Sequence, residues 1–238
     1  MLAMVGTSGY SYKEWKGRFY PEKLPANEML AFYAARFGTV EVNNTFYRMP
    51  EESMLAEWST RVPDDFVFSF KVPRRITHIK RLHDAGADLA EFLRRTAVLG
   101  TKVGPLLVQL PPFAKVDLDA LRAFLAELPA EGRFAFEFRH DSWLCEPVYE
   151  ALHAHGAMLC VADTEERSVP LIATSGSGYL RLRSLAYQDA DLRAWAERIA
   201  ANAWDRVYVY FKHEDQALGP QFAQRFIEAW RDVTGAAR

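Results

Sequence analysis

Short runs rich in β-forming residues alternate with amphipathic helical stretches along the whole chain, and this alternation limits the possible folds more than any other feature. Such alternation favours a parallel sheet whose strands are joined by right-handed helical crossovers. Eight units in 238 residues fit one closed (β/α)₈ barrel of the TIM type. The predicted strands are Met4–Ser8, Thr39–Asn43, Val67–Lys71, Leu106–Gln109, Phe134–Phe138, Met158–Val161, Tyr179–Leu182 and Val207–Phe211.

The segments between the predicted strands carry apolar residues at helical spacing, which predicts a helix in every unit but one. Asp191 is placed to cap the helix that follows it, and shorter helices are expected at Glu51–Arg61 and Pro147–His155. Residues 164–178 have no helical periodicity, so we expect the sixth helix to be short or missing. No linker, repeat or low-complexity tract divides the chain, and residues 1–238 are predicted to form a single domain. An open doubly wound sheet is the alternative, but no GxGxxG motif follows the first strand.

Composition excludes several function classes. The chain carries 29 Lys and Arg against 31 Asp and Glu, a net charge of −2, which gives no global argument for nucleic acid or an anionic membrane. No apolar run approaches the roughly 20 residues that span a bilayer, and the start of the chain does not read as a signal peptide. Cys145 and Cys160 form no disulfide framework. We therefore expect a cytoplasmic protein without a membrane partner, whose oligomeric state the sequence does not indicate.

The alternation of side chains within the strands predicts which residues face the barrel interior. Apolar faces must meet the helices, so the polar faces point inward and gather at the C-terminal strand ends, where barrel enzymes build their sites. The predicted mouth contains Glu41, Asn43, Lys71, Gln109, Glu137, Arg139, Asp163, Arg181 and Lys212. The loop residues expected on its rim are Tyr10, Trp15, Tyr47, His78, His140, Trp143 and His213, with ligand stacking and loop packing both open for Trp15 and Trp143.

The charges of this mouth favour a small anionic or polyhydroxylated ligand, because three acids face four bases in a confined site. We predict an enzyme that acts on a small anionic, sugar-like or phosphorylated substrate, with Glu41, Lys71 and Glu137 as catalytic residues and Glu137 or Glu41 as the acid/base group. Substrate contacts are predicted for Tyr10, Asn43, Tyr47, His78, Gln109, Arg139, His140, Trp143, Asp163, Arg181 and Lys212. The cationic members would bind the anion, and Asn43 and Gln109 would orient hydroxyl groups.

Other interpretations of the same residues remain open. Glu41 with Lys71, and Glu137 with Arg139, would form structural ion pairs if the ring had no function. Glu41, Glu137 and Asp163 with a histidine would suit a divalent metal, but the neighbouring cations oppose one and no metal ligand is predicted. Lys71 or Lys212 would form a Schiff base only with a depressed pKa, whereas a carboxylate partner would raise it.

A basic run between Lys71 and Arg81 raises nucleic acid as a second, less favoured partner. It contains five Lys and Arg in eleven residues, but Asp84 and Asp88 follow closely and favour a solvated loop. Two alternatives to an enzyme that acts on small anions therefore remain. One is a nucleic-acid-binding protein or metal-assisted nuclease, and the other is a non-catalytic sensor of a small ligand.

Motifs that run through almost the whole chain carry a family resemblance. They include Gly6-Thr7-Ser8-Gly9-Tyr10, Val40-Glu41-Val42-Asn43, Phe68-Ser69-Phe70-Lys71, Gly104 to Pro112, Glu137-Phe138-Arg139-His140 and Tyr208-Val209-Tyr210-Phe211. In these motifs the sequence resembles the YecE-like family, also called domain of unknown function 72. The resemblance implies a TIM-like barrel and supplies no established activity. The chain departs from many relatives at Arg183-Ser184, where they carry His-Gly, and at Lys212-His213-Glu214, where they carry asparagines.

Overall fold

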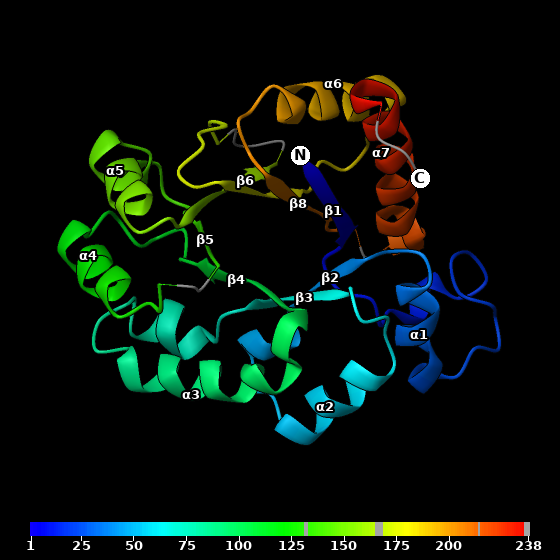
Figure 1. Cartoon of the computed structure of the whole chain (residues 1–238), viewed down its shortest axis with the longest axis horizontal. Coiled ribbons are helices and arrows are strands. Elements are labelled where there is room, and N and C mark those ends of the chain that lie inside the picture. Colours follow the sequence, from blue (N-terminus) through cyan, green and yellow to red (C-terminus); the bar gives the residue numbers. More distant parts are fainter. Residues whose placement is uncertain (131–132, 165–168, 214, 236–238) are drawn as a thin grey trace.

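Eight parallel strands form a nearly closed barrel in the computed structural model, which describes residues 1–130, 133–164, 169–213 and 215–235. The strands follow one another around the barrel in the order β1-β8-β7-β6-β5-β4-β3-β2. Figure 1 shows them as a ring with the helices outside. The strands are β1 Leu2–Thr7, β2 Thr39–Val42, β3 Val67–Lys71, β4 Val103–Gln109, β5 Phe134–Glu137, β6 Met158–Asp163, β7 Ser177–Leu182 and β8 Arg206–Phe211. All eight predicted strands are confirmed, with ends that shift by up to three residues.

Helices cover the outside of this ring. The α-helices of the described residues are α1 Met29–Ala34, α2 Glu52–Thr60, α3 Gly86–Thr96, α4 Leu118–Ala126, α5 Glu146–Ala154, α6 Asp189–Ala200 and α7 Leu218–Thr234. Single short turns lie at η1 Lys13–Trp15, η2 Ala26–Glu28, η3 Asn44–Phe46, η4 Arg75–Ile79, η5 Ala97–Lys102, η6 Asp141–Trp143 and η7 Asp215–Ala217. No helix among the described residues is long and apolar enough to cross a membrane.

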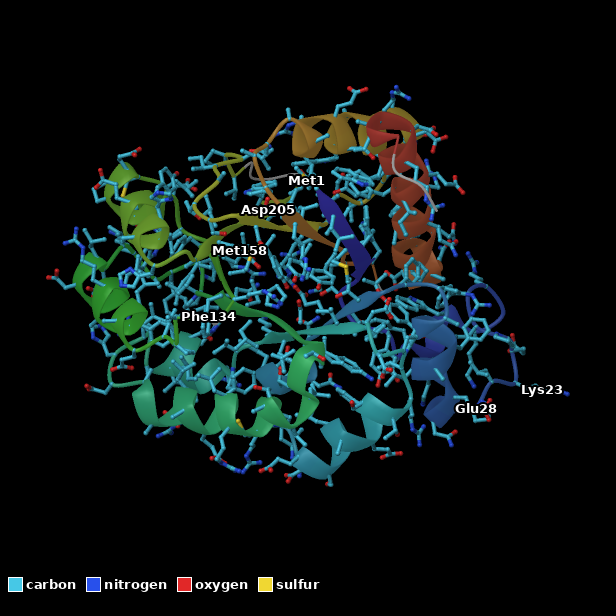
Figure 2. The ribbon with its side chains drawn as sticks, viewed as in Figure 1. Met1, Lys23, Glu28, Phe134, Met158 and Asp205 are labelled. Carbon is cyan, nitrogen blue, oxygen red and sulfur yellow. The ribbon has the colours of Figure 1, made fainter. Side chains whose placement is uncertain are left out.

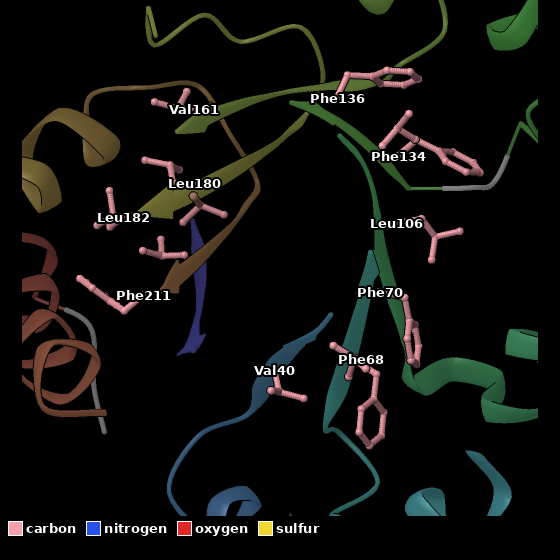
Figure 3. Packing of buried hydrophobic residues seen from close by; sticks show 14 of the residues in the cluster. Val40, Phe68, Phe70, Leu106, Phe134, Phe136, Val161, Leu180, Leu182 and Phe211 are labelled. Atoms are coloured by element: carbon pink, nitrogen blue, oxygen red, sulfur yellow. The ribbon is translucent and has the colours of Figure 1, made fainter. Parts of the chain in front are cut away.

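The two faces of the strands differ in chemistry, as the alternation predicts. Outward-facing side chains such as Phe68, Phe136 and Leu180 are fully buried against the helices, and Figure 3 shows them on the outer side of the ring. Inside the barrel, the lower layers are apolar and aromatic and fill the space beneath the mouth. This interior plug consists of Val67, Leu107, Ala135, Met158, Cys160, Tyr179, Tyr208 and Tyr210, with Met4 packed against it.

The unit between β6 and β7 differs from the others, as predicted. Its described part, residues 169–176, contains no helix. Thr174 ties this connection to the barrel: its hydroxyl donates to the carbonyl of Ala157 at 2.7 Å and accepts the N–H of Leu159 at 2.8 Å. A side chain thus satisfies backbone groups at the start of β6. One predicted detail is wrong: α6 begins before Asp191, with Gln188 as its N-cap, and Asp191 completes a capping box from the third helical position.

The seam between β1 and β2 is the weakest junction of the barrel. A single bridge, Ser8 to Glu41, joins the two strands there, and the N–H of Gly9 donates to the carbonyl of Glu41 at 2.8 Å. The opposite edge of β1 pairs along its length with β8, whose start lies beside that of β1 in Figure 2. At the seam the strands approach so closely that a Cβ on Gly6 would lie 2.1 Å from the carbonyl oxygen of Thr39. Only glycine therefore fits at position 6 without a backbone shift.

We expect Gly6→Ala to destabilise the protein by opening this seam. Overpacking costs of about 1–3 kcal/mol are typical, which corresponds to a loss of several degrees in Tm at roughly 2–4 °C per kcal/mol for a chain of this size. Thermal unfolding followed by circular dichroism measures the shift. Gly176→Ala is the matched control, because a Cβ there meets only an ordinary contact at 3.6 Å. Equal Tm values for the two variants would contradict the role of Gly6.

Candidate active site at the barrel mouth

Arg181 lies between two buried glutamates at the centre of the mouth. It comes from β7 and only 1% of it is exposed. Its Nη2 and Nε donate to Oε1 of Glu41, on β2, at 2.9 and 3.2 Å, and its Nη1 donates to Oε2 of Glu137, on β5, at 2.6 Å. One guanidinium therefore joins three strands from different sides of the barrel, in the fork geometry that suits carboxylates.

Neutral side chains complete the hydrogen bonding of the two glutamates. The hydroxyls of Ser8 and Tyr179 donate to Glu41, the latter at 2.6 Å. The side-chain amide of Gln109 donates to Oε2 of Glu137 at 2.8 Å. Each buried carboxylate thus has partners for both of its oxygens, which is the condition under which buried charge is tolerated. The predicted mouth residues Glu41, Gln109, Glu137 and Arg181 do come together.

These contacts hold both carboxyl groups in the ionised form. Burial by itself would raise the pKa of Glu41 and Glu137, because it penalises charge. Arg181 and the hydrogen bonds outweigh burial, and the pKa of each carboxyl is lowered. A carboxylate in this state holds no proton to donate at neutral pH and accepts one poorly. Glu41, Glu137 and Arg181 therefore form a fixed cluster, which we call the ion cluster.

Lys71, at the end of β3, lies beside the ion cluster without joining it. No carboxylate of the described residues lies within 4.0 Å of its Nζ, which instead lies over the ring of Phe46, 3.8 Å from the centroid. The expected pair of Glu41 with Lys71 is wrong, because Arg181 occupies Glu41 instead. Burial lowers the pKa of Lys71 to about 7, and the charge of Arg181 adds to the shift. The direction is the opposite of that expected for a lysine held by a carboxylate.

Two more arginines lie at strand ends of the mouth, Arg139 after β5 and Arg183 after β7. Nε of Arg139 donates to Oε1 of Glu137 at 2.9 Å, which confirms that predicted pair. Within the described part of the chain its two terminal nitrogens have no protein partner. Arg183 has no carboxylate partner among the same residues, and burial lowers its pKa, with the neighbouring charges of Arg181 and Arg139 adding to the effect. The mouth therefore carries cationic groups that the described protein atoms leave unneutralised.

Three histidines of the mouth region each have a ring nitrogen within hydrogen-bond distance of a neighbouring group. Burial and the charge of Lys71 lower the pKa of His78 to about 4, so its ring is neutral at physiological pH. Its Nδ1 lies 2.9 Å from the hydroxyl of Thr77. His140 accepts the N–H of Ser142 at 3.1 Å on Nδ1. His213 donates from Nε2 to the carbonyl of Ser184 at 2.6 Å and packs edge-on against Phe222.

The other predicted site residues lie farther out. Asp163, at the end of β6, accepts the hydroxyl of Tyr187 at 2.6 Å and is not part of the ion cluster. Tyr47 is 75% exposed after η3. Lys212 follows β8, and its backbone N–H donates to the carbonyl of Leu182, the last residue of β7. Asn43 and Tyr10 lie at the seam between β1 and β2, where they line a shallow cleft.

Both tryptophans expected on the rim are packed into the protein instead. Trp143 is 2% exposed, stacks on Phe138 with ring centroids 4.6 Å apart, and donates from its indole nitrogen to the carbonyl of Ala114. Trp15 is 1% exposed and stacks on Tyr20. The rim placement is therefore wrong for both, because the loops that carry them fold back onto the outer layer of the barrel. Both rings instead pack within the protein, which is the alternative left open above.

Sequence reasoning missed three residues of the mouth: Ser8, Tyr179 and Arg183. The signal for Tyr179 and Arg183 was present, because they share the inward face of β7 with Arg181 in the strand alternation. Ser8 carries no comparable signal, since its role depends on the seam that places it against Glu41.

The described residues do not provide the set of ligands that the metal alternative requires. Among the residues that the structure describes, no group of three His, Cys, Asp or Glu side chains is placed to hold a metal ion. Arg181 lies between Glu41 and Glu137, and Asp163 points to Tyr187. In the basic run after β3, Asp88 pairs with two of the five cations, Arg75 at 2.9 Å and Lys80 at 2.8 Å.

Residues 4–237, which include every strand end of this mouth, match the family model described as protein of unknown function DUF72. The chain belongs to the DUF72 family. This confirms the resemblance to the YecE-like proteins. Among curated relatives, the UPF0759 protein YecE of Escherichia coli K12 is 33% identical over 138 residues, 56% of this chain and 51% of the relative, so the match spans about half the length of that protein. The UPF0759 protein YunF of Bacillus subtilis 168 is 22% identical over 91% of this chain and 80% of its own.

Solved structures of DUF72 members share this fold. A DUF72 family protein from Thermotoga maritima superposes with a TM-score of 0.84 at 27% identity, covering 96% of this chain and 98% of its own. A DUF72 family protein from Enterococcus faecalis V583 has a TM-score of 0.77 at 18% identity, covering 100% and 97%. The second likeness concerns the fold alone.

We expect Arg181→Met to destabilise this DUF72 protein strongly at neutral pH. The change leaves Glu41 without a cationic partner and Glu137 with Arg139 alone, and the loss of one partner of a buried ion pair typically costs about 3–5 kcal/mol. In the parent protein the lowered pKa values stabilise the fold above about pH 4.3, the ordinary glutamate value, and this contribution is lost as the pH falls toward the folded-state values. In the variant the same carboxyls have raised pKa values. Its deficit relative to the parent should therefore shrink between pH 7 and pH 5.

Urea unfolding at the two pH values measures this difference. Arg193→Met is the control, because Arg193 pairs with Glu197 on the exposed surface of α6 and its loss should change stability by less than about 0.5 kcal/mol. A deficit in Arg181→Met that stays constant with pH would show that the carboxyls are not the source of the instability.

Proposed function

We propose that this chain is an enzyme that acts on a small anionic, sugar-like substrate at the barrel mouth, with Lys71 as the group that transfers a proton. The observation that carries the proposal is the amine of Lys71. Burial lowers its pKa to about 7, it has no carboxylate partner among the described residues, and the charges of Arg181 and Arg139 lie close enough to add to the shift. An amine with such a pKa is present in both protonation states at neutral pH, as a general acid/base requires.

Arg139 and Arg183 support an anionic substrate. The terminal nitrogens of Arg139 have no carboxylate partner among the described residues, although its Nε donates to Glu137, and the guanidinium of Arg183 has no carboxylate partner there either. Guanidinium groups bind carboxylates and phosphates through paired hydrogen bonds. An anion between them would also raise the pKa of Lys71 and so couple binding to protonation.

In this proposal the ion cluster holds the side chains of the mouth in a fixed geometry. Glu41 and Glu137 stay predicted catalytic residues, but their lowered pKa values favour Lys71 for proton transfer. Their role in the proposal is to hold Arg181 rigidly, while Gln109 and Asn43 present amide groups that hydrogen-bond to substrate hydroxyls. Rigid support from outer hydrogen bonds is what keeps a catalytic group in place.

A binding experiment tests the anion and Lys71 together. Sugar acids are the probes, because their carboxylates do not titrate near pH 7. We expect them to bind more tightly at pH 6 than at pH 8, since a bound carboxylate favours protonated Lys71, and the effect fades as the pH rises through about 7. In Lys71→Met the pH dependence should vanish and affinity at pH 6 should fall roughly tenfold to hundredfold, the usual worth of a charged hydrogen bond.

Isothermal titration calorimetry measures these affinities, and Lys115→Met is the control because Lys115 is an exposed lysine of the loop after β4. Arg139→Ala and Arg183→Ala should weaken the same ligands. If sugar acids do not bind and short oligonucleotides do, the mouth belongs to the nucleic-acid alternative and the proposal fails.

Proton transfer by Lys71 has its own signature. An enzyme that removes a proton from a carbon atom beside a carbonyl or carboxylate exchanges that proton with solvent. We therefore expect the parent protein to introduce deuterium into a bound sugar acid in D₂O, and Lys71→Met to abolish the exchange while sparing the fold. Proton NMR follows the signal. Binding without exchange or any other conversion would identify a sensor instead of an enzyme.

A further inference from the structure

We propose that the cleft beside the β1–β2 seam is a second subsite, which takes an uncharged sugar ring of the substrate whose anionic group occupies the mouth. This inference rests on the proposed function and adds the substrate class: sugar acids or sugar phosphates with an intact ring, as distinct from short acyclic acids. The cleft has a volume of about 160 Å³. Sites for drug-sized ligands are larger, roughly 300–1,000 Å³, so this one has room for about one ring.

The lining of the cleft contains aromatic rings, hydroxyls and amides but no charged side chain. Its residues are Gly9, Tyr10, Ser11, Tyr12, Val42, Asn43, Asn44 and Trp58. Burial raises the pKa of Tyr10 to about 12, so its hydroxyl is a neutral donor at physiological pH. A site without charge, beside a mouth with excess positive charge, favours the neutral part of a ligand over its anionic part.

The aromatic rings form a corner and not a parallel slot. Tyr10 and Trp58 lie with ring centroids 6.0 Å apart and planes at 85°. A flat nucleobase is gripped best between parallel faces, as in proteins that stack single strands. A corner fits a ring that is not flat, with C–H groups against one aromatic face and hydroxyls directed elsewhere. The geometry thus favours a sugar ring over a base.

Three polar groups of the lining have no hydrogen-bond partner among the described residues and can bind a ligand. Among the described residues, none hydrogen-bonds to the hydroxyl of Tyr10, the indole N–H of Trp58 or the side-chain amide of Asn44. An asparagine amide offers two donors and one acceptor oxygen, which suits neighbouring hydroxyls of one sugar. Tyr and Trp combine an apolar face with a polar edge for the same purpose.

A short chain of hydrogen bonds connects the cleft with the mouth. Asn43 lines the cleft, and its side-chain amide donates to Oγ of Ser8 at 2.8 Å. Ser8 donates in turn to Glu41 and accepts Nη2 of Arg181 at 3.3 Å. One side chain, Ser8, therefore connects the lining of the neutral cleft with the ion cluster, and the proposed ligand would place its ring on one side of Ser8 and its acid group on the other.

The first test examines the cleft alone, without the mouth. The probes are uncharged methyl glycosides of common hexoses and pentoses, titrated into the full chain. The indole N–H signal of Trp58, assigned by its absence in Trp58→Phe, should shift with at least one glycoside. Nucleosides should leave it unmoved. A shift with nucleosides only, or with neither class, would overturn the subsite whatever happens at the mouth.

The second test uses matched variants and paired probes. Asn44→Ala and Tyr10→Phe each remove polar atoms from the cleft, and Asn27→Ala removes an exposed asparagine elsewhere. We expect the two cleft variants to bind a cyclic sugar acid about two- to tenfold more weakly, the worth of one neutral hydrogen bond. Their affinity for acyclic lactate should not change, and Asn27→Ala should match the parent for both.

The outcomes separate the two proposals. If cyclic and acyclic acids bind equally well in the parent and in both cleft variants, the mouth binds anions and the subsite is wrong. If neither acid binds but glycosides still shift the Trp58 signal, the subsite stands as a sugar site and the proposed function fails. Weaker binding of the cyclic acid confined to the cleft variants supports both.

Discussion

The ion cluster of Arg181 with Glu41 and Glu137 is the constraint on which the rest of the mouth depends. Buried ion pairs of this kind contribute little net stability, and apolar residues of similar volume often replace them without loss. Their geometric effect is larger. Arg181 fixes β7 to β2 and β5 across the barrel and, through Ser8, to the end of β1. The seam between β1 and β2, which a single bridge joins, is therefore held at its upper end by charge.

The same cluster explains why the remaining cations are unusual. Two buried carboxylates would neutralise two of the cations around them if each took a separate partner. Arg181 engages both, and only the Nε of Arg139 shares Glu137. Lys71 is then left in a partly buried place next to like charge, and its pKa falls to about 7. The lowered pKa of Lys71 thus follows first from its burial and then from a pairing of charges that leaves it without a carboxylate partner among the described residues.

Sequence predicted the barrel well because its evidence is local. Strand alternation placed Glu41, Glu137 and Arg181 on inward faces, and the missing periodicity of residues 164–178 indicated the irregular unit. The pair of Glu137 with Arg139 was predictable because both follow one strand, but the partner of Glu41 was not, since it depends on which strands face each other across the barrel. The predicted rim placement of Trp15 and Trp143 was wrong for a related reason. Both residues lie in loops, and a loop that packs back onto the outer layer shows no periodic pattern in the sequence.

The vertical order of the barrel interior decides from which side a ligand reaches the ion cluster. Below the cluster lies the interior plug, in which Tyr208, Met158 and Leu107 are buried almost completely. This plug removes water from the lower face of the ions, which strengthens their mutual attraction and gives no path from the N-terminal end. Any ligand of these charges must therefore approach through the loops at the C-terminal strand ends. Those loops contain Arg183, after β7, and Lys212, after β8. The ion cluster below them contributes fixed charges to the mouth, and under the proposed function the loops determine which anion fits over it.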